Sequence, residues 1–154
     1  MWKVESSDFE HISLHDNFIS KVQMDGDDIL LIFNEGFDVV KTHPLNDTGK
    51  SKLTTAAQII LRNGNLTKGT LLRYIGTENQ GIEEEINFTY LLNFTHEIEV
   101  SHFHVENGVF SLFSHEIIHD DKMDFLTLAF SCNDVLFCWN DYASDAWFEG
   151  WSED

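Results

Sequence analysis

The residues His115-Glu116-Ile117-Ile118-His119 match the H-E-x-x-H pattern that is typical of zinc metallopeptidases. That chemistry requires a helix, because residues four apart share a helix face and both imidazoles can then reach one Zn²⁺. The glutamate between them would act as the general base. On a strand the two histidines would lie about 13 Å apart, and Glu116 would point to the opposite face. The function of the motif therefore depends on the element that carries it.

The flanking sequence predicts a strand at this position. Asn107-Gly108 is the most favourable two-residue hairpin turn in the chain, and Glu97–Glu106 and Val109–Ile118 are its two arms. Phe, Ile and Val populate the second arm, and these residues favour strands. We therefore predict no catalytic residue, no metal ligand and no cofactor. The alternative is a zinc-dependent hydrolase in which His115 and His119 bind the metal and Glu116 is catalytic.

The same hairpin predicts a histidine-rich face. If Glu106 pairs with Val109, five histidines fall on one side of the sheet: His96, His102, His104, His115 and His119. Such a face could bind a transition metal or respond to pH. Four apolar residues fall on the same side in this register: Ile98, Val100, Phe113 and Ile117. We interpret this face as a partly covered, solvent-facing side of the sheet.

Strand-length apolar runs separated by turn residues recur along the chain. Phe18–Met24 and Ile29–Asn34 flank Asp25-Gly26-Asp27-Asp28, which predicts a hairpin. Glu83–Phe94 is compatible with a short helix or a strand, and residues 143–151 are compatible with a short helix. We predict a single domain over residues 1–154 that is mainly β. It would be an antiparallel sandwich or a strongly curved sheet, built from hairpins, with at most two short helices.

A second C-terminal hairpin is expected around Asn133-Asp134, between Phe125–Cys132 and Val135–Asp141. One of its faces is almost wholly apolar and should be buried; it includes Leu128, Phe130, Phe137 and Trp139. In this register Cys132 and Cys138 lie on opposite faces, which makes a disulfide between them geometrically unfavourable. Reduced thiols fit a cytoplasmic protein.

Charge is the strongest feature of the composition. The 154 residues include 27 acidic and 9 basic ones, giving a net charge of −18. Such a field repels phosphate backbones and anionic lipids and attracts basic proteins. The basic residues form no patch for a nucleic acid, and no apolar run approaches the roughly 18 residues of a membrane helix. The N-terminus turns polar at once, without the apolar segment of a signal peptide. We therefore predict a cytoplasmic protein with a basic protein partner, without nucleic-acid or membrane binding.

The first part of the chain resembles a group of known families. Leu14-His15-Asp16, the turn at Asp25-Gly26 and the run Ile29–Phe33 are similar to the opening of several small β-rich bacterial families of unknown function. The resemblance covers roughly the first 40 residues, and some of these families are thought to be immunity proteins that neutralise secreted toxins. It implies a compact, non-enzymatic, cytoplasmic protein and brings no catalytic residues.

Three hypotheses follow from the sequence. The leading one is a non-catalytic acidic module that binds proteins, of the immunity type that neutralises a basic toxin. The second is the zinc-dependent hydrolase described above. The third is a structural or assembly subunit without a ligand, forming a homo-oligomer. Metal content would separate the second hypothesis from the others, and salt-sensitive association with a basic protein would separate the first from the third.

Overall fold

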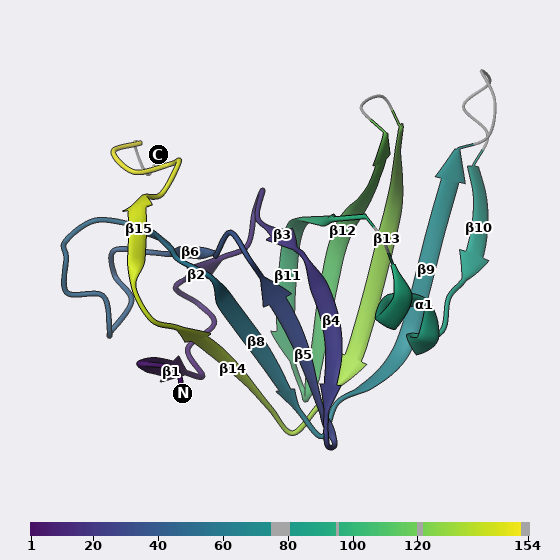
Figure 1. Ribbon diagram of the computed structural model, residues 1–154, viewed down its shortest axis with the longest axis horizontal. Helices are drawn as coiled ribbons and strands as arrows, with labels where there is room; N and C mark the ends of the chain where they lie inside the picture. Colours follow the sequence, from purple (N-terminus) through teal and green to yellow (C-terminus); the bar gives the residue numbers. More distant parts are fainter. Residues whose placement is uncertain (75–80, 95, 120–121, 152–154) are drawn as a thin grey trace.

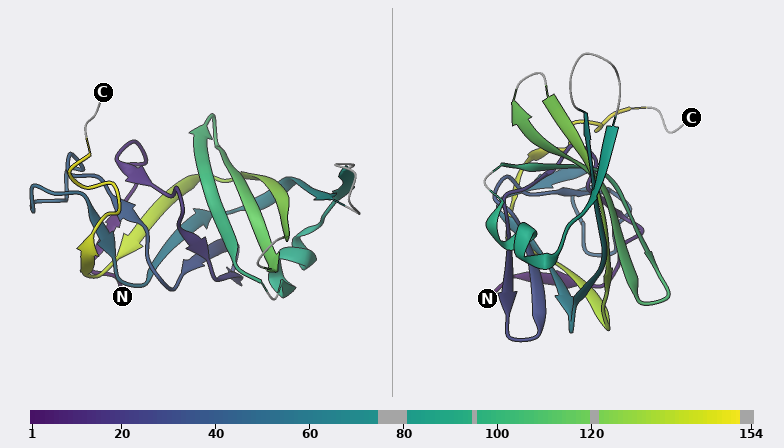
Figure 2. Two further views of the ribbon diagram at one scale, coloured as in Figure 1. Left: turned by 90° about the horizontal axis from the view of Figure 1, so that it is seen from above. Right: turned by 90° about the vertical axis from the view of Figure 1, so that its right-hand side faces the viewer.

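The computed structural model describes residues 1–74, 81–94, 96–119 and 122–151 (Figure 1). Most of these described residues are in strands, which form three antiparallel sheets, and six of them form one short helix. This confirms the prediction of a mainly antiparallel β fold with at most two short helices. The two larger sheets form separate layers, which the right-hand view of Figure 2 shows side by side.

The sheets bring together strands that are distant in the sequence. In spatial order, the first consists of β1 (Val4–Ser6), β14 (Asp134–Trp139), β8 (Ala57–Arg62), β5 (Asp28–Phe33) and β4 (Lys21–Asp25). The second consists of β10 (Gly81–Glu85), β9 (Asn65–Tyr74), β13 (Lys122–Ser131), β12 (Val109–His119), β11 (Ile98–Glu106) and β3 (Phe18–Ile19). The third consists of β15 (Tyr142–Asp145), β7 (Lys52–Thr54), β6 (Asp38–Val39) and β2 (Ile12–Ser13).

Both hairpins with a glycine turn form where the sequence predicts them. Asp25 pairs with Asp28 between β4 and β5, and Glu106 pairs with Val109 between β11 and β12. Gly26 has a φ of 61° and Gly108 a φ of 75°, a region that glycine enters without steric cost. Residues of β5 alternate between buried and partly buried, as expected for a strand with one face on the core.

The expected hairpin around Asn133-Asp134 does not form, and that prediction is wrong. β13 pairs with β12 and β9, whereas β14 pairs with β8 and β1. The chain passes from one large sheet to the other between them, and the Asn133 N–H donates to the Arg62 carbonyl at 2.8 Å. The alternation of apolar residues shows which face of each strand is buried. Two strands can bury such faces together either by pairing in one sheet or by facing each other from opposed sheets, so the alternation does not decide between these arrangements.

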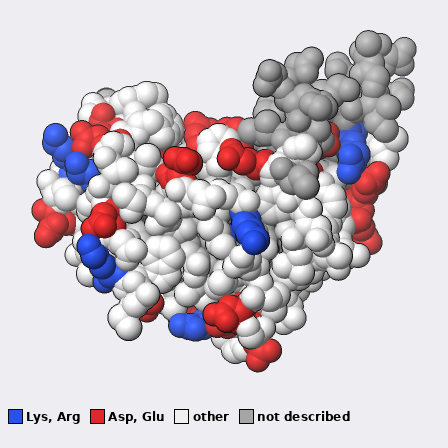
Figure 3. All heavy atoms as spheres, viewed as in Figure 1, with Lys and Arg blue, Asp and Glu red and all other residues white. Residues whose placement is uncertain are grey.

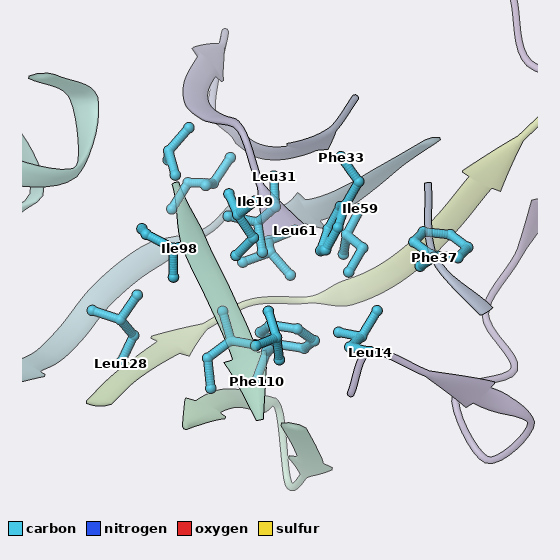
Figure 4. Close-up of a cluster of buried hydrophobic side chains, with 14 of the residues drawn as sticks. Leu14, Ile19, Leu31, Phe33, Phe37, Ile59, Leu61, Ile98, Phe110 and Leu128 are labelled. Atoms are coloured by element: carbon cyan, nitrogen blue, oxygen red, sulfur yellow. The ribbon is translucent and has the colours of Figure 1, made fainter. Parts of the chain in front are cut away.

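The core lies between the two large sheets (Figure 4). Leu128, Phe130, Phe137 and Trp139 are at most 1% exposed and belong to one buried cluster, which confirms their predicted burial. Phe103 on β11 bridges the layers, because its ring centroid lies 5.8 Å from that of Phe137 on β14. Both cysteines are free thiols, Cys132 partly buried and Cys138 buried.

The segment compatible with either helix or strand contains both. β10 ends at Glu85, and α1 (Phe88–Asn93) follows with Asn87 as its N-cap. The expectation of a C-terminal helix is wrong: residues 142–145 form β15 and turns follow. Trp147 and Trp151 stay 46% and 66% exposed. Within the described residues, no helix is both long and apolar enough to cross a membrane.

Candidate functional site

The H-E-x-x-H segment lies in β12, which confirms the predicted strand. Glu116 is buried on the inner face of the sheet. His115 projects from the outer face, opposite Glu99 and against the edge of the Phe125 ring, with 4.7 Å between ring centroids. The side chain of His119 lies outside the described residues. Because the strand sends His115 and Glu116 to opposite faces, they cannot act as ligand and general base at one metal.

Glu116 has a structural contact instead. Its carboxylate accepts a hydrogen bond from the Tyr90 hydroxyl, which fastens α1 to the sheet. Burial, together with this bond to Glu116, raises the pKa of Tyr90, so the phenol stays protonated and can donate. Asp124 stands opposite Glu116 on β13, and the Arg73 guanidinium lies 3.9 Å from its carboxylate.

The predicted histidine-rich face is only partly correct, because β11 contains a bulge between Val100 and His102. His102 pairs with Phe113 as predicted, and the two rings stack at 4.4 Å. The extra residue of the bulge reverses the side of the sheet to which the earlier residues of β11 point. Ile98 and Val100 are therefore fully buried in the core and do not lie on the histidine side. His102, His104 and His115 remain on the outer face, and His96 lies before the strand. Among the described residues, no group of three or more His, Cys, Asp or Glu side chains could hold a metal ion.

The bulge has a second effect, because it holds the segment before β3. The Asp16 N–H donates to the Val100 carbonyl at 2.9 Å, and the Val100 N–H donates to the Asn17 carbonyl at 2.8 Å. His15 Nδ1 donates to the Ser101 carbonyl at 2.7 Å. Asp16 is thereby held in the left-handed region, with a φ of 63°, which aspartate tolerates better than most residues. These bonds fix Asp16 and Asn17 at the rim of a cleft.

The cleft has a volume of about 400 Å³ and is lined by segments far apart in the sequence. Its carboxylates come from Asp16, Glu35, Asp38 and Asp145, and its aromatic walls from Phe18 and Trp147. Figure 1 shows β2, β6 and β15 at the end of the molecule opposite β10. A volume of this size falls at the small end of the range for ligand pockets, about 300–1,000 Å³.

Asp38 is the unusual residue of this cleft. It is 1% exposed, and among the described residues neither of its carboxylate oxygens has a hydrogen-bond partner. Asn17 Oδ1, also buried in the cleft lining, lacks a partner too. Burial raises the pKa of Asp38 to about 6; a weak contact from the Asn17 side-chain amide, outside normal hydrogen-bond geometry, opposes this rise, and the Asp16 carboxylate adds to it. Buried carboxylates are normally paired, and an unpaired one costs stability.

The backbone holds Asp38 in this position. β6 pairs on one side with β2 and on the other with β7, so Asp38 lies opposite both Ser13 and Leu53. The preceding Gly36 has a φ of 79°, and a Cβ there would lie 2.1 Å from the Thr54 carbonyl oxygen. A glycine is therefore required for the sharp entry into β6. Phe37, between Gly36 and Asp38, is fully buried, and its N–H donates to Thr54 Oγ1 at 3.1 Å.

The carboxylates of the cleft differ in their partners. Asp145 pairs with Lys52 at 2.7 Å and with Lys50 at 3.8 Å, and the Lys52 ammonium lowers its pKa. Within the described part of the chain, no lysine or arginine forms an ion pair with Asp16, Glu35 or Asp38. The cleft is therefore rich in hydrogen-bond acceptors and negative charge, and among the described residues lysines balance only the carboxylate of Asp145.

Comparisons of the chain with protein-family models, curated proteins and solved structures found no match. Asp38 is not among the site residues that the sequence predicts. The available signal was a carboxylate inside the apolar run Phe37-Asp38-Val39-Val40, where a buried charge needs an explanation.

Proposed function

We propose that this protein is a non-catalytic, acidic module that captures a basic protein through the face containing the cleft. The observation that carries the proposal is the set of cleft carboxylates, Asp16, Glu35 and Asp38, that pair with no lysine or arginine among the described residues. The Asp16 carboxylate lies 3.6 Å from the His15 imidazole, which carries a charge only when it is protonated. Unpaired negative charge concentrated in a concavity attracts cationic groups more strongly than the same charge on a convex surface.

The remaining charges support this proposal. Several of the few basic side chains are already engaged: Lys3 pairs with Asp141 at 2.8 Å and Arg62 with Asp28 at 3.1 Å. The excess of carboxylates therefore dominates the outer field, and Figure 3 shows groups of acidic side chains with basic ones singly between them. Long-range attraction of this kind increases association rates with a positively charged partner.

The exposed aromatic residues next to the cleft would supply the short-range contacts. Trp147 and Trp151 stand edge to face, with centroids 5.1 Å apart; Trp147 is about half exposed and Trp151 about two thirds. Tryptophan is enriched among the residues that contribute most to protein–protein binding. Some of the families that the N-terminal segment resembles are thought to neutralise toxins, and the net charge of −18 favours a basic partner, so we propose an immunity-type role directed at a basic toxin.

Association kinetics with a small basic protein test the proposal. We would measure the association rate with cytochrome c and with lysine-acetylated cytochrome c. Raising the salt from about 0.01 M to about 1 M shortens the Debye length from about 30 Å to about 3 Å. The association rate with the unmodified protein should fall more than tenfold. A rate that is insensitive to salt, or equal for the acetylated protein, would contradict the proposal.

A matched pair of variants separates the cleft from net charge. Glu35→Gln/Asp38→Asn removes two carboxylates of the cleft, and Glu83→Gln/Glu85→Gln removes two exposed carboxylates of β10. Both double variants change the net charge equally. The cleft variant should bind the basic protein more weakly than the β10 variant, and equal affinities would remove the cleft from the mechanism.

A further inference from the structure

We propose that the cleft takes up the guanidinium group of one arginine side chain of the partner, with Asp38 as the buried carboxylate that receives it. This inference rests on the proposed function, and it names the chemical group that the site recognises. It is carried by the hydrogen-bonding needs of the cleft and by the side chains that form its walls.

The unmet hydrogen bonds of the cleft are all acceptors. Both carboxylate oxygens of Asp38 and the Oδ1 atom of Asn17 are buried without a partner among the described residues. A ligand that satisfies them must direct several donors at these atoms. Guanidinium has five N–H donors in a planar fork and no acceptor. A carboxylate can accept two of these bonds side by side, and the amide oxygen a third.

The walls of the cleft also favour a flat organic cation. Phe18 and Trp147 line it, and aromatic faces attract cations that lie within about 6 Å of the ring centroid. Guanidinium is planar and weakly hydrated, so it stacks on such rings and loses less hydration than an ammonium on entering a buried site. A bare metal ion is a poorer candidate, since no three ligating side chains among the described residues converge.

The closing experiment uses three small probes that differ in one group: N-acetyl-arginine amide, N-acetyl-citrulline amide and N-acetyl-lysine amide. Citrulline keeps the shape of arginine but is neutral. Binding is followed by NMR titration of the protein, including the Asp38 side-chain carboxyl carbon. We expect the arginine probe to bind and to shift the Asp38 signal, and the citrulline probe to bind at least tenfold more weakly. Equal binding of citrulline would overturn the proposal, and equal or tighter binding of lysine would overturn the choice of arginine.

Variants locate the probe on the protein. Asp38→Asn should weaken binding of the arginine probe at least tenfold, whereas the exposed Glu83→Gln should leave it unchanged. Trp147→Leu should weaken binding severalfold through loss of the stacking surface. If the Asp38→Asn variant is folded and binds the arginine probe as the natural protein does, the assignment is wrong.

The pH dependence gives a second readout. Because the pKa of Asp38 is about 6, arginine-probe binding must displace a proton below that pH, and affinity should fall as the pH is lowered from 7 to 5. The titratable and charged groups around the cleft are His15, Asp16, Glu35, Lys50, Lys52, Glu99 and Asp145. In the Asp38→Asn variant this fall should be lost; a pH dependence that persists there would assign it to another of these groups and contradict the role of Asp38.

Failure of this inference can be distinguished from failure of the proposed function. If Asp38→Asn leaves salt-dependent capture of cytochrome c intact and the arginine probe does not bind, the proposed acidic module is supported and the proposed arginine site is contradicted. If the arginine probe binds through Asp38 but cytochrome c shows no salt-dependent capture, the arginine site is supported and the proposed capture of a basic protein is contradicted.

Discussion

Removing the buried charge of Asp38 should stabilise the protein while weakening its proposed activity. The pKa of Asp38 is about 6 in the folded protein, compared with about 3.9 for an aspartate in an unfolded chain. The folded state therefore binds its proton more tightly. Below the unfolded-state pKa both states are protonated and the charge has no effect on stability. As the pH rises from the unfolded-state pKa to the folded-state pKa, the natural protein loses stability. This loss is complete above the folded-state pKa.

The magnitude follows from the difference between the two pKa values. About two pKa units correspond to about 3 kcal/mol, which is an upper estimate. The asparagine side chain introduced by Asp38→Asn has nearly the same shape as aspartate and no charge to desolvate. The free energy of unfolding of the variant should therefore be higher than that of the natural protein, by up to about 3 kcal/mol at pH 8 and by about 2 kcal/mol at pH 5.5.

Urea denaturation followed by tryptophan fluorescence at these two pH values measures the effect. Glu83→Gln is the control, because Glu83 is exposed on β10 and its replacement should change the free energy of unfolding by no more than about 0.5 kcal/mol. An Asp38→Asn variant that is less stable than the natural protein at pH 8, or whose advantage does not change with pH, would refute the reasoning.

Three further predictions concern the core and the H-E-x-x-H segment. Phe130→Ala should cost about 3–5 kcal/mol in urea denaturation because the ring is fully buried, and a loss under about 1 kcal/mol would contradict its place in the core. Tyr90→Phe should cost about 1–3 kcal/mol because Glu116 loses its donor; an unchanged unfolding midpoint would exclude that role. Elemental analysis should find no stoichiometric zinc. About one zinc per chain, lost on His115→Ala, would restore the hydrolase hypothesis.

The sequence by itself determined the features that depend on neighbouring residues. Asn107-Gly108 adopts the hairpin turn because asparagine and glycine tolerate the positive φ values that such a turn requires. These values are 52° at Asn107 and 75° at Gly108. β12 begins directly after that turn. Local sequence therefore predicts that His115 and Glu116 lie on a strand and point to opposite faces. The burial of Phe130 and Phe137 could also be predicted, because the alternation of apolar residues records which face of a strand meets the core.

Tertiary structure alone decided which strands pair and where the candidate site lies. The alternation that predicted a β13–β14 hairpin is satisfied equally well by strands in opposed sheets, so the pairing depends on distant partners. The bulge in β11 lies where Val100 exchanges backbone hydrogen bonds with Asp16 and Asn17, which are far away in the sequence. The burial of Asp38 requires β2 and β7 to enclose β6, and the cleft combines segments from both halves of the chain. A carboxylate acquires a perturbed pKa and unmet hydrogen bonds from what surrounds it in space, and a single sequence does not encode those neighbours locally.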